Sequence, residues 1–135
     1  MLTPDDLGLI AAARAVLEQQ YKPFWHTVSA ALRMSDGRIV TGIHLGAAVG
    51  RLAVCAEAVA LGRAILDGGG SVVTAVAVRH PKPDEDDRDL AVVSPCGACR
   101  EMFTDHAPGA MVIVPGRSGP EKVSVQDLLP LPYRR

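Results

Sequence analysis

Three cysteines in two short motifs constrain this chain more than any other feature. The first motif is Cys55-Ala56-Glu57, and the second is Ser94-Pro95-Cys96-Gly97-Ala98-Cys99. Each motif stands where the sequence predicts the start of a helix, directly after a strand or a loop. Unpaired backbone N–H groups and the helix dipole favour negative charge at such positions, so they stabilise thiolates. The two motifs therefore bring three potential thiolates to the beginnings of two helices.

Zinc is the metal that these side chains favour, because thiolate sulfur is one of its preferred ligands. A Cys-x-x-Cys pair at a helix start places two sulfurs within reach of one ion, and Cys55 supplies a third from another helix. Structural zinc sites normally have four protein ligands, whereas catalytic sites have three and leave one position for water. Glu57 is spaced to reach that water and move its proton. The motifs predict a catalytic Zn²⁺ site formed by Cys55, Cys96 and Cys99.

The order of apolar and turn residues predicts an α/β fold. Thr3-Pro4-Asp5-Asp6 is typical of a helix start, with an apolar stripe expected at Leu7, Ile10, Ala11 and Leu17. Two apolar runs around Ser35-Asp36-Gly37 predict a β-hairpin. The expected strands cover 27–34, 38–45, 71–78, 90–93 and 110–114, and the later helices cover 54–66, 97–106 and 124–129. This pattern predicts a three-layer α/β/α sandwich with a five-stranded mixed sheet, in a single domain over residues 1–135.

The charge and composition limit which partners and which cellular compartment we expect. The formal net charge is -1, which is not the basic excess of a nucleic-acid-binding protein. We see no secretory leader and no apolar run of about 18 residues, so no membrane partner is expected. An odd number of cysteines argues against a disulfide framework and for a reducing, cytoplasmic location. The acidic segment 80–89 is expected to be a solvated excursion from the sheet.

Cys-Ala-Glu followed 40 residues later by Pro-Cys-x-x-Cys resembles the zinc-dependent cytidine deaminases. The resemblance is strongest to the small homotetrameric type with three cysteine ligands, to which blasticidin-S deaminase is related, and it extends from about Tyr21 to Tyr133. It implies that Cys55, Cys96 and Cys99 bind zinc and that Glu57 is the catalytic proton shuttle. It also implies that the backbone of Ala56 and of Ser94 holds the substrate near the metal.

The resemblance implies hydrolytic deamination: an activated water attacks an amino-bearing ring carbon, and ammonia leaves. The substrate is then a small amino-heterocycle, such as a pyrimidine base, a triazine-like ring or a modified nucleoside. The implied assembly is a homotetramer. Near the C-terminus, Tyr133 matches an aromatic residue that helps to close the pocket in this family, sometimes across a subunit interface.

The sequence departs from the family pattern where the substrate would bind. The family has Phe-Pro-Val-Gly-Ala-Ala-Leu on its first strand, where this chain has His26 in place of the phenylalanine that packs against the pyrimidine. The family also carries Gly-x-Asn-x-Glu, whose Asn and Glu bind the ribose hydroxyls, where this chain has His44 and Gly46. A glycine offers no acceptor for a hydroxyl. We therefore expect activity on cytidine itself to be weak or absent. We also expect His26 and His44 to contact the substrate.

A third departure concerns the charge around the metal. Three thiolates and Zn²⁺ sum to −1, which opposes ionisation of a bound water. The family offsets this charge with an arginine directly after the catalytic glutamate, where this chain has Ala58. Arg51 and Arg100 are the candidates for the compensating charge.

Three other interpretations of the motifs stay open from sequence. The enzyme could be a true cytidine or deoxycytidine deaminase of pyrimidine salvage, with His44 replacing the missing contacts. Cys96 and Cys99 could instead form a redox pair, which leaves Cys55-Ala56-Glu57 unexplained. A non-catalytic zinc-binding module would need a fourth ligand, for which the chain offers four histidines: His26, His44, His80 and His106.

Overall fold

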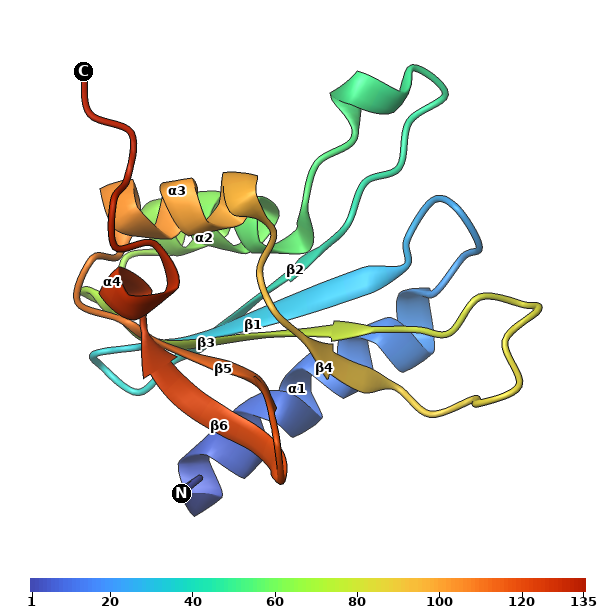
Figure 1. Cartoon of the computed structure of the whole chain (residues 1–135), viewed down its shortest axis with the longest axis horizontal. Helices are drawn as coiled ribbons and strands as arrows, with labels where there is room; N and C mark the ends of the chain where they lie inside the picture. Colours follow the sequence, from blue (N-terminus) through green and yellow to red (C-terminus); the bar gives the residue numbers. More distant parts are fainter.

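The layered α/β architecture expected from the sequence is confirmed (Figure 1). A computed structural model of the chain describes all 135 residues. Its elements are, in chain order, α1 (Pro4–Gln20), β1 (Val28–Met34), β2 (Ile39–Ile43), the short 3₁₀ helix η1 (Gly50–Leu52), α2 (Ala56–Asp67), β3 (Val72–Arg79), β4 (Ala91–Val93), α3 (Gly97–His106), β5 (Met111–Gly116), β6 (Gly119–Ser124) and α4 (Val125–Leu128). No helix is long and apolar enough to cross a membrane.

The sheet is mixed, with the strand order β2-β1-β3-β5-β6. Only β3 and β5 pair in parallel, and all the other pairs are antiparallel. The strand β3 is shared along its length, because Thr74–Val76 pair with β5 and Ala77–Arg79 pair with the short β4. The chain leaves β4 and enters α3 through the second cysteine motif, so this short strand positions Cys96 and Cys99.

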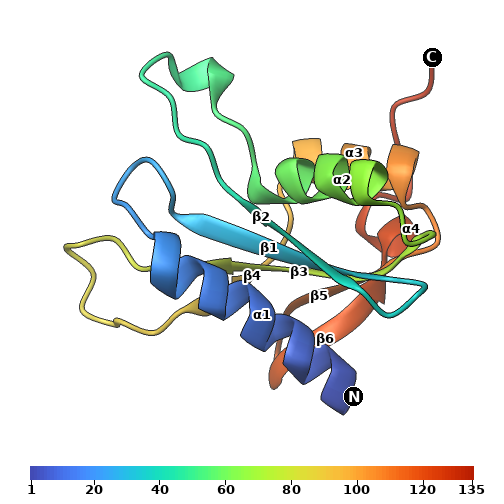
Figure 2. The ribbon, with the colours of Figure 1, turned by 180° about the vertical axis from the view of Figure 1, so that it is seen from behind.

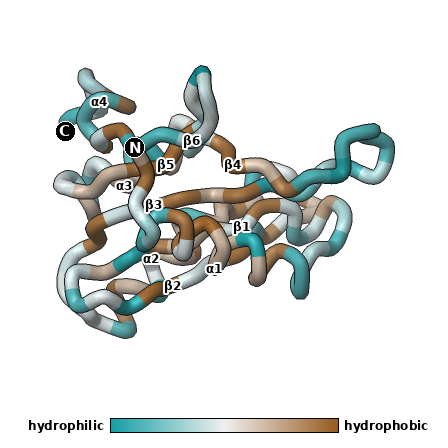
Figure 3. The backbone as a smooth tube through the Cα atoms, turned by 90° about the horizontal axis from the view of Figure 1, so that it is seen from below, coloured by the Kyte–Doolittle hydropathy of each residue, from teal (hydrophilic) through white to brown (hydrophobic).

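Helices cover both faces of the sheet, α1 on one face and α2 with α3 on the other (Figures 1 and 2). The side chains of β1 and β3 alternate accordingly, as the pleat of a strand requires. Ala30 and Ala77 belong to the core under α2 and α3, whereas Ala31 and Val76 belong to the core under α1. Figure 3 shows the apolar strands at the centre and the hydrophilic loop between β3 and β4 at the periphery. The expected three-layer arrangement thus rests on two separate cores.

The strand count differs from the sequence prediction, because the sheet has six strands rather than five. The extra strand, β6, pairs with β5 along the edge of the sheet and ends at the cap of α4. Its sequence, Gly-Pro-Glu-Lys-Val-Ser, has one strongly apolar residue and begins with turn residues. A strand at a sheet edge needs no continuous apolar pattern, and it tolerates proline. Periodicity therefore carried no signal for β6.

The apolar face of α1 matches the predicted stripe in part, because Ile10 and Leu17 are buried as expected but two other members are not. Leu9, Ala13 and Leu17 are fully buried, whereas Leu7 is 57% exposed and Ala11 is also exposed. The predicted start at Thr3 is confirmed: the Asp6 N–H donates to the Thr3 hydroxyl, and the Thr3 N–H donates to the Asp6 carboxylate. These reciprocal bonds form a capping box, which satisfies two backbone donors at the helix start.

Replacing Asp6 with alanine is expected to destabilise the protein by about 1–2 kcal/mol. Asp6 is buried, accepts the hydrogen bond from Thr3 and lies 3.0 Å from the Lys122 ammonium on β6. Chemical denaturation of D6A beside D5A measures the difference, because Asp5 is an exposed acid in the same helical turn. Equal losses in the two variants would contradict this role for Asp6.

The Asp6 contribution also depends on pH. Burial alone would raise the pKa of Asp6, but the hydrogen bonds from Thr3 and the Lys122 ammonium hold it below the ordinary value of 3.8. A carboxyl whose pKa is lowered by folding stabilises the protein above its unfolded pKa, and this stability is lost as the pH falls through the folded pKa. The stability difference between wild type and D6A should therefore narrow below about pH 3.8.

Candidate metal centre

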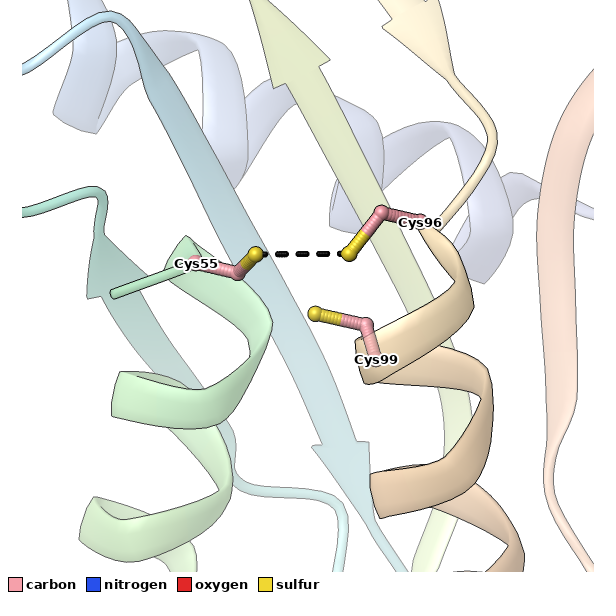
Figure 4. A group of neighbouring side chains, drawn as sticks. All are labelled: Cys55, Cys96 and Cys99. Atoms are coloured by element: carbon pink, nitrogen blue, oxygen red, sulfur yellow. Dashed lines mark hydrogen bonds between the residues drawn. The ribbon is translucent and has the colours of Figure 1, made fainter. Parts of the chain in front are cut away.

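The three cysteines meet where the N-termini of α2 and α3 lie side by side (Figure 4). Cys55 is the N-cap residue of α2, Cys96 is the N-cap residue of α3, and Cys99 follows in the first turn of α3. Their Sγ atoms all lie within 4.8 Å of one another, and the Cys55 and Cys96 sulfurs are 3.4 Å apart. The structure thus brings together the thiols that the two sequence motifs singled out.

This cluster fits a tetrahedral zinc ion. Sulfur ligands at about 2.3 Å from zinc stand about 3.8 Å from each other in tetrahedral geometry, which is inside the observed spread. No histidine or carboxylate joins the three sulfurs as a further member of the cluster. A closed structural centre with a histidine as fourth ligand is therefore not what the structure forms. Three sulfur ligands leave one coordination position for a water or a substrate atom.

The protein environment shifts the pKa values of the three thiols in different directions. Burial raises the pKa of the Cys55 and Cys99 thiols, and Cys99 is only 1% exposed within the core. Burial acts in the same direction on Cys96, but hydrogen bonds from the N–H groups of Cys99 and Ala98 lower its pKa below the ordinary value. Three close thiolates repel one another, so a cation is needed for all three to ionise together. This requirement suits a bound divalent metal.

Glu57 lies in the first turn of α2, two residues after Cys55, and is only 6% exposed. Burial raises the pKa of its carboxyl, and hydrogen bonds with its own N–H and with the Cys99 thiol oppose that rise only in part. A carboxyl with a raised pKa is suited to taking up a proton and returning it near neutral pH. Glu57 is therefore placed to act as an acid and base beside the metal site.

A pocket of about 150 Å³ opens over the cysteines. Most of its lining consists of residues that the sequence predicts for the site: His44, Cys55, Ala56, Glu57, Ser94 and Cys96. Two further lining residues are not predicted, Val28, which begins β1, and Val93, which ends β4. Apolar residues at strand ends are common, so nothing in the sequence marks these two as site residues. A cavity of about 150 Å³ holds roughly one benzene-sized ring.

His44 forms part of the pocket wall in a fixed orientation. The Thr27 N–H lies 3.2 Å from His44 Nδ1, so that nitrogen accepts a hydrogen bond, and the Thr27 hydroxyl is 3.1 Å from the same atom. Burial, together with the nearby His26, lowers the pKa of His44. The neutral ring therefore carries its hydrogen on Nε2 and offers a donor there. Thr27 thus supports His44 in the pocket wall, a role that the sequence does not predict.

His26 does not line this pocket. Its Nδ1 donates to the His44 carbonyl at 2.9 Å, which ties the segment before β1 to the end of β2. The ring of His26 instead borders a separate cavity at the β2 edge of the sheet, together with residues such as Gln19 of α1 and Arg63 of α2. In the structure, His26 thus supports the backbone of His44 rather than the metal pocket.

Gly46 stands where the resembled family carries its ribose-binding glutamate, and here the backbone leaves no space for a side chain. A Cβ added at Gly46 would lie 2.3 Å from the Phe24 carbonyl oxygen and 3.0 Å from Trp25 Cα. The Gly46 N–H donates to the Trp25 carbonyl at 2.8 Å, which holds the segment against it. The segment before β1 therefore occupies the space that a glutamate side chain would need.

Replacing Gly46 with alanine is expected to destabilise the protein by about 1–3 kcal/mol, because the new Cβ must displace backbone atoms. Gly50 is the matched control, since a Cβ added there meets nothing within 4 Å in the same loop. Chemical denaturation of G46A and G50A makes the comparison. If G46A unfolds at the same denaturant concentration as G50A, the close packing described for Gly46 is wrong.

The structure places the remaining predicted residues outside the pocket. Arg100 is half-buried next to Cys99, where its guanidinium donates to the carbonyls of Pro95 and Leu128, so it braces the loop that carries Cys96. Arg51 is exposed on η1, in a loop that projects beyond the helices (Figure 1). Tyr133 is exposed on the C-terminal tail, and its N–H donates to Glu101 of α3.

Comparison with known proteins identifies what this arrangement resembles. The family model for the cytidine and deoxycytidylate deaminase zinc-binding region matches residues 4–114. A blasticidin-S deaminase from Bacillus cereus is 41% identical over 99% of this chain and 96% of its own length. A cytidine deaminase from Halalkalibacterium halodurans is 32% identical over 90% of this chain and 89% of its own. Both relatives therefore match along almost their whole length.

Solved structures agree with these sequence matches. The cytidine deaminase from Burkholderia pseudomallei superposes with a TM-score of 0.75 at 28% identity, covering 98% of this chain and 100% of its own. The cytidine deaminase from Mycobacterium tuberculosis gives a TM-score of 0.76 at 25% identity over 98% and 100% of the two chains. The likeness thus covers the whole sheet and its helices as well as the two motifs.

Proposed function

This chain belongs to the cytidine and deoxycytidylate deaminase family of zinc-dependent enzymes, and we propose that it removes the exocyclic amine of a small amino-heterocycle by hydrolysis. The reaction consumes one water, forms a carbon–oxygen bond at the ring and breaks the carbon–nitrogen bond, so ammonia is the second product. The observation that carries the proposal is the combination of three convergent thiols with a buried carboxyl in one small pocket.

Each site residue has a role in this proposal. Cys55, Cys96 and Cys99 would hold the metal, and Zn²⁺ at this position would supply the Lewis acidity that activates water near neutral pH. Glu57 takes a proton from the attacking water and delivers it to a ring nitrogen, and it then carries the proton of the newly added hydroxyl to the departing amine. The Ala56 N–H and the Ser94 carbonyl orient the ring in the pocket that both residues line. His44 donates from Nε2 to an acceptor on the substrate.

Two arginines stand in for the charge-compensating residue that Ala58 replaces. Arg100 lies directly after Cys99 and is half-buried, and its guanidinium donates to the carbonyl of Pro95, the residue before Cys96. Its guanidinium meets only carbonyl oxygens and no carboxylate. Arg51 is exposed on a projecting loop of its own chain, so it would act near a metal only in an assembly.

The proposed function is tested by measuring ammonia release across a panel of ring amines. Cytosine, cytidine, deoxycytidine, aminotriazines, aminopurines and blasticidin S cover the candidate substrate classes. In water enriched in ¹⁸O, the new ring oxygen of the product should carry the label, because hydrolysis takes that oxygen from solvent. If the protein retains zinc but releases ammonia from none of the compounds, the interpretation as a non-catalytic zinc-binding module is favoured.

Cytidine deamination is the second candidate function, because cytidine deaminases are among the relatives and the solved structures. The pocket argues against strong activity on this nucleoside, since His44 and Gly46 replace the residues that bind ribose in the resembled family. A single histidine donor does not replace an amide and a carboxylate together. Robust turnover of cytidine, compared with the other compounds of the panel, would make this second candidate the better description.

The resemblance also leads us to propose a homotetramer. Large apolar side chains are exposed on the single chain, including Leu52 on η1, Leu66 at the end of α2 and Leu131 on the tail. An assembly would remove these side chains from water, which is favourable. Tyr133 and Arg51, which lie away from their own pocket, would then be available to a neighbouring one. Light scattering should give four times the chain mass of 14.2 kDa, and the mass of a single chain would contradict the proposal.

We propose that the enzyme works in the cytoplasm. All three cysteines are free thiols, and free thiol clusters persist in reducing compartments.

A further inference from the structure

A second and larger cavity adjoins the catalytic pocket. Its volume is about 430 Å³, within the range of about 300–1,000 Å³ that is usual for ligand sites. One wall is the segment between α1 and β1, and the other is the loop after β3. These two segments lie side by side in Figures 1 and 2. They are also tied by contacts, since the Tyr21 hydroxyl donates to the Pro81 carbonyl.

Two adjacent residues connect this cavity with the pocket over the cysteines. Val28 lines both cavities. Thr27 lines the larger one, while its N–H and hydroxyl hold the ring of His44 in the wall of the smaller one. The start of β1 is thus a common boundary of the two cavities.

The sizes of the two cavities indicate which part of a substrate each of them can hold. The catalytic pocket of about 150 Å³ has room for roughly one aromatic ring, so any large substituent on that ring must lie outside it. On the side of Gly46 the backbone of Phe24 and Trp25 leaves no space for a ribose-binding side chain. The larger cavity is the adjoining space in which a substituent can be accommodated.

The lining of the larger cavity indicates what kind of substituent it suits. The rings of Tyr21 and His80 stack at 3.4 Å with planes 10° apart, so one wall of the cavity is aromatic. Arg79 is already paired with Glu85, so its charge is compensated within the protein. Lys82 and Asp84 both line the cavity and neither side chain forms an ion pair or hydrogen bond in the chain. The exposed part of the cavity lining therefore carries one positive and one negative side chain that have no ionic partner in the chain.

We propose that the two cavities form one substrate site, in which the deaminated ring occupies the catalytic pocket and a substituent larger than ribose occupies the cavity between the α1–β1 segment and the loop after β3. The body of the substituent packs against Tyr21 and His80, and charged groups of both signs at its outer end meet Lys82 and Asp84. This inference rests on the proposed deaminase function, because it names the class of molecule that the same site takes.

Three compounds with the same ring test the inference: cytosine, cytidine and blasticidin S, whose cytosine carries a long substituent with both charges. The variants are H80A and the double variant K82A/D84A. The matched control is D86A, because Asp86 is an exposed acid of the same loop that does not line the cavity. Initial rates of ammonia release give kcat/KM for each pair of enzyme and compound.

We expect kcat/KM of the wild type to be at least about tenfold higher for blasticidin S than for cytosine. In both cavity variants, kcat/KM should fall about tenfold for blasticidin S. For cytosine it should stay within about twofold of the wild-type value, because only the substituent reaches the altered residues. D86A should match the wild type on every compound. Equal effects of the cavity variants on blasticidin S and on cytosine would overturn the inference, as would a wild type that prefers the bare ring.

These outcomes separate the inference from the proposed function. Ammonia release from cytosine or cytidine without any dependence on the cavity overturns the extended site alone and leaves the deaminase assignment standing. Ammonia release from none of the panel compounds overturns the deaminase proposal and the extended site together.

Discussion

Replacing Glu57 with glutamine is expected to lower kcat by about 10²–10⁴-fold while the protein keeps its zinc. Glutamine has nearly the shape of glutamate but cannot take up a proton, and Glu57 is not among the three clustered metal ligands. Ammonia release measured beside metal analysis separates the two roles. Because Glu57 is buried in the catalytic pocket, no other carboxyl of the chain is placed to substitute for it.

E101Q is the matched control for this change. Glu101 lies on α3 outside the pocket, where it accepts a hydrogen bond from the Tyr133 N–H, and a glutamine oxygen can still accept that bond. E101Q should therefore keep both zinc and activity. Full activity in E57Q, or a loss of zinc in E57Q, would show that Glu57 is not the proton carrier described here.

Replacing Cys99 with serine is expected to abolish zinc binding and to lower ammonia release to background. Serine has a similar size, so little buried volume is lost, but its hydroxyl is a poor zinc ligand compared with a thiolate. Metal binding that occurs only in the folded state also stabilises that state. C99S should consequently unfold at a lower temperature, and its stability should no longer respond to added zinc.

F103L separates the loss of metal from general damage to α3. Phe103 is buried one helical turn beyond Cys99, and its truncation removes core packing without touching the sulfur cluster. This variant should lose stability but bind about one zinc per chain. If C99S holds zinc as tightly as F103L does, Cys99 is not a ligand.

The elements around the site follow from local sequence signals. The expected helix 97–106 coincides with α3, and the hairpin around Ser35-Asp36-Gly37 forms as β1 and β2. In both cysteine motifs the first cysteine is an N-cap residue with extended backbone, and a helix follows directly. Such signals act within a few residues, which is why they could be predicted without knowledge of the fold.

Other features depend on packing between distant segments. The strand β6 is polar and forms because β5 offers a free edge, and the choice of the buried stripe on α1 depends on the sheet beneath it. His26 is predicted to lie beside the substrate, but it borders a different cavity and its Nδ1 donates to the His44 carbonyl. The larger cavity, formed by segments about 60 residues apart such as Tyr21 and Pro81, has no sequence signature at all.

Glycine and alanine explain how the metal ligands come so close to the sheet. A Cβ at Gly42 of β2 would lie 2.4 Å from the Ala56 carbonyl oxygen at the start of α2. Ala60 and Ala64 continue the small residues along the buried side of that helix. The close approach of helix and strand buries Glu57 beside the sulfurs, and this burial raises the pKa of the Glu57 carboxyl.

The central claim is that zinc held by three thiols makes this protein a hydrolytic deaminase. The most direct measurement is ammonia release from the ring-amine panel by the protein as purified, after chelation of its metal, and after zinc is returned. We predict about one zinc per chain, loss of ammonia release on chelation and its recovery with zinc. Ammonia release by the metal-free protein at the rate of the zinc-loaded protein would contradict the claim.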